Sequence, residues 1–173
     1  MSSCGSSTEP TTRPGPARTT YNILFVCTGN TCRSPMALAL ARDAVARRGL
    51  ANVALASAGI SAAAGEPAAA HARTAVAELG LDLDDHRATQ LTPEQVRWAD
   101  LILGMGPSHL SAAEALSGKG KTSLITDFLD GRDAGRPVPD PILGDLELYR
   151  ATRDRLQTAI EAMLDRLEPI LAP

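Results

Sequence analysis

Aromatic residues, cysteines and long apolar runs are all scarce in this sequence. Among its 173 residues are one Trp, two Tyr and two Phe, so we expect an aliphatic core. Three cysteines are too few for the disulfide framework of a small secreted protein, which favours a reducing cytosol. No segment approaches the roughly 20 apolar residues of a membrane span, and the first residues have no apolar stretch typical of a signal peptide. We therefore expect a cytoplasmic protein with no membrane partner.

A large excess of charge of one sign is also lacking. There are 17 basic and 20 acidic residues, and the net charge of -3 gives no general attraction for nucleic acid or an anionic membrane. Any anion site must therefore be local. The apolar fraction of 44% and the charged fraction of 21% are ordinary for a globular protein of about one domain.

The pattern along the chain predicts a short tail and one α/β domain. Residues 1–20 are rich in Ser, Thr, Pro and Gly without apolar periodicity, so we expect a disordered tail before a domain over 21–173. Short apolar runs predict strands over 22–26, 53–57, 101–103 and 122–125. Helical patterns begin after Ser34, at Pro67, at Pro93, after Ser108 and near Asp145. This alternation predicts a four-stranded parallel sheet flanked by helices on both faces, with ligands bound beyond the carboxyl ends of the strands.

One stretch at such a strand end has the chemistry of a phosphate site. Residues 26–35 read VCTGNTCRSP. A loop of backbone amides that leads into a helix binds oxyanions. Gly29 allows close approach of the backbone, and Asn30 tolerates left-handed geometry. Arg33 offers a planar fork for two phosphate oxygens. The stretch predicts a loop that holds a phosphate ion or phosphoryl group.

The same stretch places a nucleophile beneath the phosphate. Such an electropositive loop favours the thiolate form of Cys27, and Ser34 can donate a hydrogen bond to this thiolate and help it leave. A buried structural cysteine is the alternative, which the surrounding spacing disfavours. Phosphoryl transfer also needs an acid and a base, and Asp140, held between two prolines, can serve as both. Taken alone, an Asp between prolines is more often a turn residue.

These segments resemble a known family. VCTGNTCRSPMA and PDPI are similar to the signature loop and the acid loop of the low-molecular-weight protein tyrosine phosphatases, and further similar segments cover the chain from residue 22 to about 170. The resemblance implies a phosphocysteine mechanism without metal or cofactor. It assigns the nucleophile to Cys27, the transition-state clamp to Arg33 and the general acid to Asp140. We expect the rest of the loop to bind the substrate phosphate: Thr28, Gly29, Asn30, Thr31, Cys32 and Ser34.

The resemblance also bears on Cys32 and on the substrate. Cys32 is similar to the second loop cysteine that forms a protective disulfide with the nucleophile, although a small buried side chain under the loop fits equally well. Thr31 stands where the protein arginine phosphatase branch has Thr and tyrosine phosphatases usually have Ile. Ile142 replaces the aromatic residue expected after the Asp-Pro pair, which removes a wall for a phenyl ring. We therefore expect phosphoarginine in proteins as the substrate, with phosphotyrosine as the alternative.

Two readings outside this family also fit a cysteine after the first strand. A phosphocarrier module of sugar transport needs neither Arg33 nor Asp140, and a non-catalytic phosphate-binding protein needs no acid. Both are disfavoured because nucleophile, clamp and acid are all present. Of the three histidines, His71 and His109 are interpreted as surface or capping residues, and His86 as a structural hydrogen-bond partner. No pair of them has the spacing of a metal site.

Overall fold

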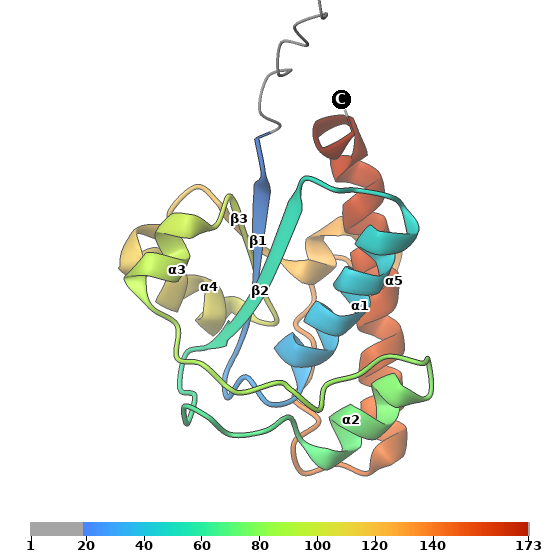
Figure 1. Ribbon diagram of the computed structural model, residues 1–173. Coiled ribbons are helices and arrows are strands. Elements are labelled where there is room, and N and C mark those ends of the chain that lie inside the picture. The colour runs from blue at the N-terminus through green and yellow to red at the C-terminus, as the bar shows by residue number, and fades with distance from the viewer. Residues whose placement is uncertain (1–18, 173) are drawn as a thin grey trace, which may run out of the picture.

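The computed structural model describes residues 19–172, so the expected tail lies almost wholly outside the described residues. Four parallel strands form one sheet in the order β2-β1-β3-β4 (Figure 1). Their bounds are Tyr21–Cys27 for β1, Val53–Gly59 for β2, Leu101–Gly104 for β3 and Thr122–Leu124 for β4. The four-stranded parallel sheet predicted from the sequence is thus confirmed.

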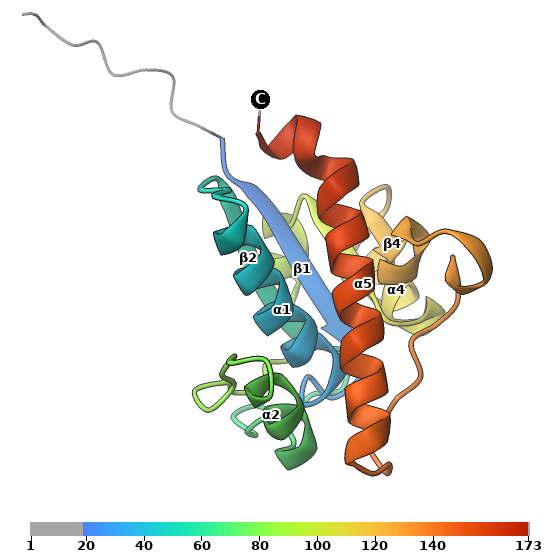
Figure 2. The ribbon, with the colours of Figure 1, turned by 90° about the vertical axis from the view of Figure 1, so that its right-hand side faces the viewer.

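Helices cover both faces of this sheet (Figures 1 and 2). One face carries α1 (Arg33–Arg47), α2 (Ala70–Ala77) and the long α5 (Leu146–Leu171). The other carries the short α3 (Pro93–Trp98) and α4 (Pro107–Ala113), which continues into a π-helical turn over Glu114–Gly118. Two 3-10 turns, Ile125–Phe128 and Gly131–Asp133, lie in the long segment before α5.

The central strand β1 divides its side chains between the two helical layers. Ile23 and Phe25 belong to the core beneath α1 and α5, whereas Leu24 and Val26 belong to the smaller core beneath α3. All four are completely buried. A strand buried on both faces reads as a continuous apolar run, which is why the sequence signals it clearly.

The parallel register brings the candidate loop together with the ends of the neighbouring strands. Cys27 pairs with Gly59 of β2, and Val26 pairs with Gly104 of β3. Because all strands run in the same direction, their carboxyl ends share one edge of the sheet, opposite the edge where β1 begins (Figure 1). Segments that follow three different strands therefore surround Cys27.

Three helix starts differ from the sequence prediction. The second helix begins at Ala70 rather than Pro67, because Ala69 is extended and donates its N–H to the carbonyl of Thr31 at 2.9 Å. Helix α4 begins at Pro107, with Gly106 rather than Ser108 at its N-cap. Helix α1 begins at Arg33, and the expected cap Ser34 has its hydroxyl engaged elsewhere.

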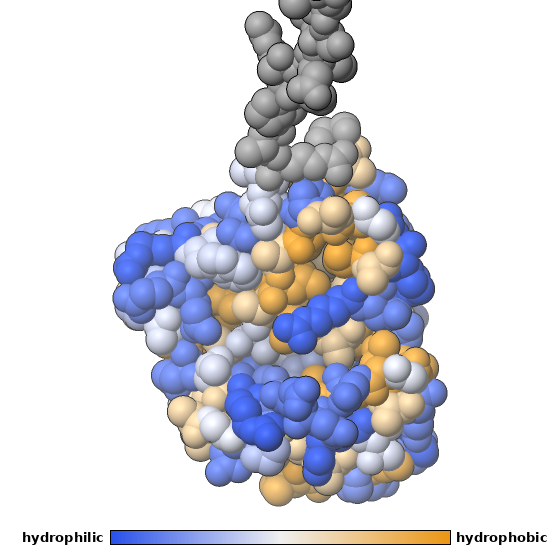
Figure 3. Space-filling view, in the orientation of Figure 1, coloured by the Kyte–Doolittle hydropathy of each residue, from blue (hydrophilic) through white to orange (hydrophobic). Residues whose placement is uncertain are grey.

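The surface of the described residues is mixed. On the face shown in Figure 3, where β2 is the nearest strand, apolar side chains lie along the edge of the sheet between polar regions. Val53 and Leu55 of this edge strand are only partly buried. Between residues 19 and 172 no helix is long and apolar enough to cross a membrane.

Candidate active site

Asn30 sets the shape of the loop between β1 and α1. It is fully buried, and its φ of 56° places it in the left-handed region that the sequence suggested. Its side-chain amide donates to Ser34 Oγ at 2.8 Å and to Ser57 Oγ at 3.0 Å. From the other side, His86 Nε2 lies 2.7 Å from the Asn30 carbonyl, and the N–H of Thr89 donates to Asn30 Oδ1 at 2.9 Å. The structural hydrogen bond expected of His86 is therefore present.

The thiol of Cys27 lies beneath this loop beside a hydroxyl. Its Sγ is 2.9 Å from Ser34 Oγ, and both residues are buried. Since the Asn30 amide already donates to Ser34 Oγ, the serine's own hydrogen is free for Cys27 Sγ, with the Ala58 carbonyl 3.4 Å away as a weaker acceptor. The pair has the geometry in which a serine stabilises a thiolate.

A glycine in the neighbouring strand allows the loop to pass. A Cβ added to Gly59, the last residue of β2, would come within 2.5 Å of the Thr28 carbonyl oxygen and 2.9 Å of the Asn30 nitrogen. At Gly29 the nearest atom to such a Cβ would be Thr31 Oγ1, at 3.6 Å. The close approach of the loop backbone to β2 thus requires glycine at position 59, whereas a side chain at position 29 would meet no other protein atom closely.

Arg33 and Asp140, which the sequence predicts as clamp and acid, lie in contact. Arg33 Nη2 donates to Asp140 Oδ2 at 3.0 Å, and Nη1 donates to the Val138 carbonyl at 3.0 Å. Nη2 also lies 3.5 Å from Thr28 Oγ1. The guanidinium is buried, whereas the Asp140 side chain is 39% exposed. The Val138 carbonyl therefore holds one end of the Arg33 guanidinium, and the Asp140 carboxylate is accessible to solvent.

Cys32 lies under the loop and is paired with a tyrosine. Its Sγ is 3.2 Å from the hydroxyl of Tyr149, which lies on α5 and is only 2% exposed, and 3.7 Å from Thr31 Oγ1. Burial raises the pKa of the Cys32 thiol. Both Cys27 and Cys32 are free thiols. The tyrosine partner of Cys32 was not predicted from the sequence, because 117 positions separate the two residues.

The interpretation of His109 as a surface or capping residue is wrong. Its side chain is 3% exposed, and its Nε2 lies 3.0 Å from Thr28 Oγ1 at the start of the loop. Burial, followed by the nearby charge of Arg33, lowers the pKa of His109 to about 4, so the ring is neutral at pH 7. By contrast, His71 is exposed on α2, with its ring edge-on to Tyr149.

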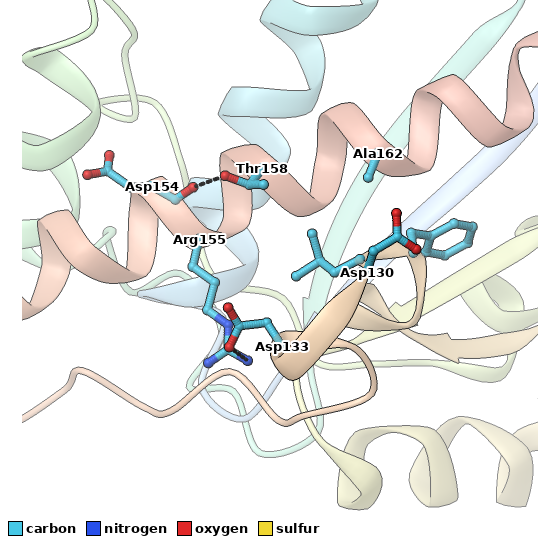
Figure 4. A pocket seen from close by; sticks show the side chains of 8 residues that line it. Asp130, Asp133, Asp154, Arg155, Thr158 and Ala162 are labelled. Carbon is cyan, nitrogen blue, oxygen red and sulfur yellow. Dashed lines mark hydrogen bonds and ion pairs between the residues drawn. The ribbon is translucent and has the colours of Figure 1, made fainter.

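A separate hollow of about 520 Å³ lies between α5 and the segment that follows β4 (Figure 4). None of the expected site residues lines it. Three carboxylates stand around it, and one of them, Asp133, lies 3.7 Å from Arg155. This acidic rim does not suit a phosphate. The lining residues are Phe128, Leu129, Asp130, Asp133, Asp154, Arg155, Thr158 and Ala162.

Comparison with known proteins identifies the family. Residues 22–170 match the model of the family described as low molecular weight phosphotyrosine protein phosphatase. The chain is 40% identical to a protein-arginine-phosphatase of Geobacillus stearothermophilus over 150 residues, covering 86% of this chain and 97% of the relative. A protein-arginine-phosphatase of Bacillus subtilis is 36% identical over 149 residues, or 85% of this chain and 97% of the relative.

Solved structures agree with this match. The structure of a YwlE arginine phosphatase, a cysteine-to-serine mutant with a phosphorylated active-site serine, superposes with a TM-score of 0.78 at 35% identity. The superposition covers 85% of this chain and 95% of the other. The family model, the sequence identity and the structural superposition agree, and the chain belongs to the low molecular weight phosphotyrosine protein phosphatase family.

Proposed function

We propose that this phosphatase removes phosphoryl groups from proteins through a phosphocysteine, with phosphoarginine as its preferred substrate. The main observation in support is that Cys27, Arg33 and Asp140 lie together around one loop at the carboxyl edge of the sheet. A nucleophile, an anion clamp and a carboxylic acid are the groups that covalent phosphoryl transfer requires.

In the first step the Cys27 thiolate attacks phosphorus, and a P–S bond forms as the bond to the leaving group breaks. For phosphoarginine this is the P–N bond, and Asp140 gives its proton to the departing guanidine nitrogen. Arg33 and the loop amides stabilise the charge on the phosphoryl oxygens in the transition state. The related structure with a phosphorylated serine in place of the cysteine supports a covalent intermediate at this position.

In the second step water attacks the phosphocysteine. The Asp140 carboxylate accepts a proton from the water, the P–S bond breaks, and inorganic phosphate leaves. Ser34 Oγ, 2.9 Å from Cys27 Sγ, donates a hydrogen bond to the thiolate as it departs. Asp140 thus returns to its protonated form and Cys27 to its thiolate, ready for the next substrate.

The preference for phosphoarginine rests on the walls of the site and on the relatives. Ile142, which follows the Asp140-Pro141 pair, is 58% exposed and gives no aromatic surface for a phenyl ring. Thr31 carries a hydroxyl on the loop where a branched alkyl group would crowd a polar guanidinium. Two relatives that match most of this chain are named protein-arginine-phosphatases. Phosphotyrosine is the second candidate, because the family model carries that name.

A side-by-side assay tests the proposal. The purified chain is given phosphoarginine and phosphotyrosine peptides of the same sequence, and kcat/KM is compared. We expect faster hydrolysis of phosphoarginine; faster phosphotyrosine hydrolysis by orders of magnitude would reverse the substrate assignment. Cys27→Ser should abolish turnover while it still binds inorganic phosphate, which separates an enzyme from a phosphate-binding protein. We place the enzyme and its phosphoprotein substrates in the cytoplasm, in keeping with the free thiols at Cys27 and Cys32.

A further inference from the structure

His109 is a buried histidine for which the phosphatase chemistry above has no use. It lies on α4, on the opposite face of the sheet from α1 (Figure 1), and reaches the loop residue Thr28 across 81 positions of sequence. The ring is 3% exposed, and its Nδ1 is buried with no hydrogen-bond partner among the described residues. An unpartnered buried nitrogen costs free energy. A histidine kept at that cost indicates that its other nitrogen, Nε2, has a role.

The turn before α4 is shaped to seat this ring. A Cβ on Gly104, at the end of β3, would come within 2.7 Å of Leu110 Cδ2 and 3.1 Å of His109 Cβ. Glycine at this position therefore lets α4 start close against the end of β3. Because β3 is the neighbour of β1, the helix then brings its third residue, His109, beside the loop. The glycine at position 104 is explained by this packing.

The Thr28 hydroxyl lies between the histidine and the clamp. Its Oγ1 is 3.0 Å from His109 Nε2 and 3.5 Å from Arg33 Nη2. Arginine can only donate, so Thr28 Oγ1 accepts from Arg33, and the hydroxyl hydrogen is left to donate to a neutral His109 at Nε2. Burial and the charge of Arg33 keep the ring neutral, with Asp140 as the nearby opposing charge.

We infer that His109 is a positioning residue: its Nε2 holds the Thr28 hydroxyl in place, and Thr28 holds one side of the Arg33 guanidinium toward the phosphate loop. The inference deepens the proposed phosphatase function and rests on it.

The need for such a support follows from the other contacts of Arg33. The same nitrogen, Nη2, is 3.0 Å from Asp140 Oδ2. In this structure Arg33 and Asp140 are therefore paired with each other. Nη2 carries two hydrogens, so it can donate to Thr28 Oγ1 on the loop side while it is paired with Asp140. Without His109 the Thr28 hydroxyl is not oriented, the loop-side contact weakens, and Asp140 is left as the dominant partner of Nη2 that phosphate has to displace.

Two replacements of His109 distinguish its two nitrogens. The side-chain amide of Gln reaches about as far as Nε2, whereas the amide of Asn reaches only as far as Nδ1, which has no partner. The full chain is compared as wild type, His109→Gln, His109→Asn, Thr28→Val and the double variant His109→Asn/Thr28→Val. Thermal unfolding is measured for each, so that activity is compared only at temperatures where every variant is folded.

We expect His109→Gln to keep kcat/KM within about twofold of wild type, and His109→Asn to lower it about tenfold through the misplaced clamp. Thr28→Val should cause a similar loss, and the double variant should be no worse than Thr28→Val alone. The Kd for inorganic phosphate should rise in the same order. Equal activities of the Gln and Asn variants, or losses that multiply in the double variant, would overturn the inference.

The outcome is separable from the substrate assignment. Every variant is measured relative to wild type on both phosphoarginine peptide and p-nitrophenyl phosphate. If wild type hydrolyses only the aryl phosphate, the proposed substrate is wrong, and the comparison of variants on the aryl phosphate still decides the role of His109. If wild type hydrolyses neither substrate, the proposed function fails, and the order of the Kd values for inorganic phosphate among the variants still decides the role of His109.

Discussion

Arg33 and Asp140 form an ion pair of 3.0 Å although 107 positions separate them in the sequence. The guanidinium is buried and held from behind by the Val138 carbonyl, while the carboxylate is 39% exposed. In the proposed mechanism a phosphoryl group that enters the loop replaces Asp140 as the partner of Arg33. The released Asp140 carboxylate then takes up a proton from solvent, and as the carboxylic acid it can protonate the leaving group.

Removal of the acid should affect poor leaving groups most. Asp140→Asn is expected to lower kcat for phosphoarginine by about 10²–10⁴-fold, because general acid catalysis is lost. The loss should be smaller for p-nitrophenyl phosphate, whose leaving group departs without a proton. Asp145→Asn is the matched control: Asp145 caps α5 through Leu148 N–H, and asparagine caps helices equally well. An equal loss for both substrates would contradict the role of Asp140 as acid.

The hydroxyl of Thr31 should influence substrate choice. Its side chain is partly exposed on the loop, and its carbonyl accepts from Ala69 N–H at 2.9 Å, a bond that any side chain at this position preserves. Thr31→Ile is expected to shift the ratio of phosphotyrosine to phosphoarginine kcat/KM upward by about tenfold or more. Thr31→Val, which removes the hydroxyl without added bulk, separates polarity from crowding. An unchanged ratio in both variants would show that the selectivity lies elsewhere.

The pair of Tyr149 and Cys32 should contribute to stability and not to turnover. Tyr149→Phe removes the partner 3.2 Å from Cys32 Sγ inside the core and is expected to cost about 1 kcal/mol. For a chain of this size that corresponds to a fall in Tm of about 2–4 °C. Calorimetry measures it, with Tyr21→Phe at the partly exposed start of β1 as control. A Tm equal to that of wild type would mean that this hydrogen bond adds nothing.

Acid should destabilise the protein through His109. Burial and Arg33 lower the pKa of this histidine to about 4, whereas in the unfolded chain it is about 6.5. As the pH falls, the unfolded chain binds a proton that the folded chain does not, so the free energy of unfolding is constant above about pH 6.5 and decreases between pH 6.5 and 4. The shift corresponds to at most roughly 3 kcal/mol.

A comparison of wild type with His109→Gln isolates this effect. Urea unfolding is measured for both proteins between pH 7.5 and 4.5. His86, whose pKa burial also lowers, is present in both and cancels. The glutamine variant should gain stability relative to wild type as the pH falls, because glutamine does not bind a proton in the unfolded chain as His109 does. Parallel curves for the two proteins would contradict the assignment.

Much of the fold could be predicted from the sequence because its signals are local. The strands are short apolar runs, largely buried in β1 and β3, and their alternation with helices indicates a parallel sheet. Gly49 and Gly80 lie where helices were expected to stop, and both have positive φ angles. The helix starts were less predictable. Serine is a common N-cap residue, but the Ser34 hydroxyl contacts Cys27 Sγ instead of capping the helix. The local sequence pattern does not reveal which of these two partners the hydroxyl takes.

The loop chemistry was equally local. Cys27, Arg33 and Ser34 are held together by seven positions of chain, so spacing alone indicated a cradle with a nucleophile. Long-range contacts were different. The ion pair of Asp140 with Arg33, the tyrosine beside Cys32 and the histidine beside Thr28 each join residues separated by more than eighty positions. For Asp140, flanking prolines and the family resemblance supplied a signal; for Tyr149 and His109 there was none.

The sequence by itself thus determined a single α/β domain and pointed to a candidate phosphate loop with its proposed nucleophile, since these depend on neighbours along the chain. Only the tertiary structure decided which distant side chains support that loop, because the ends of parallel strands gather segments from the whole chain at one edge. His109 illustrates the difference. A histidine near the start of a short helix looks like a surface residue until the sheet order places that helix beside Thr28.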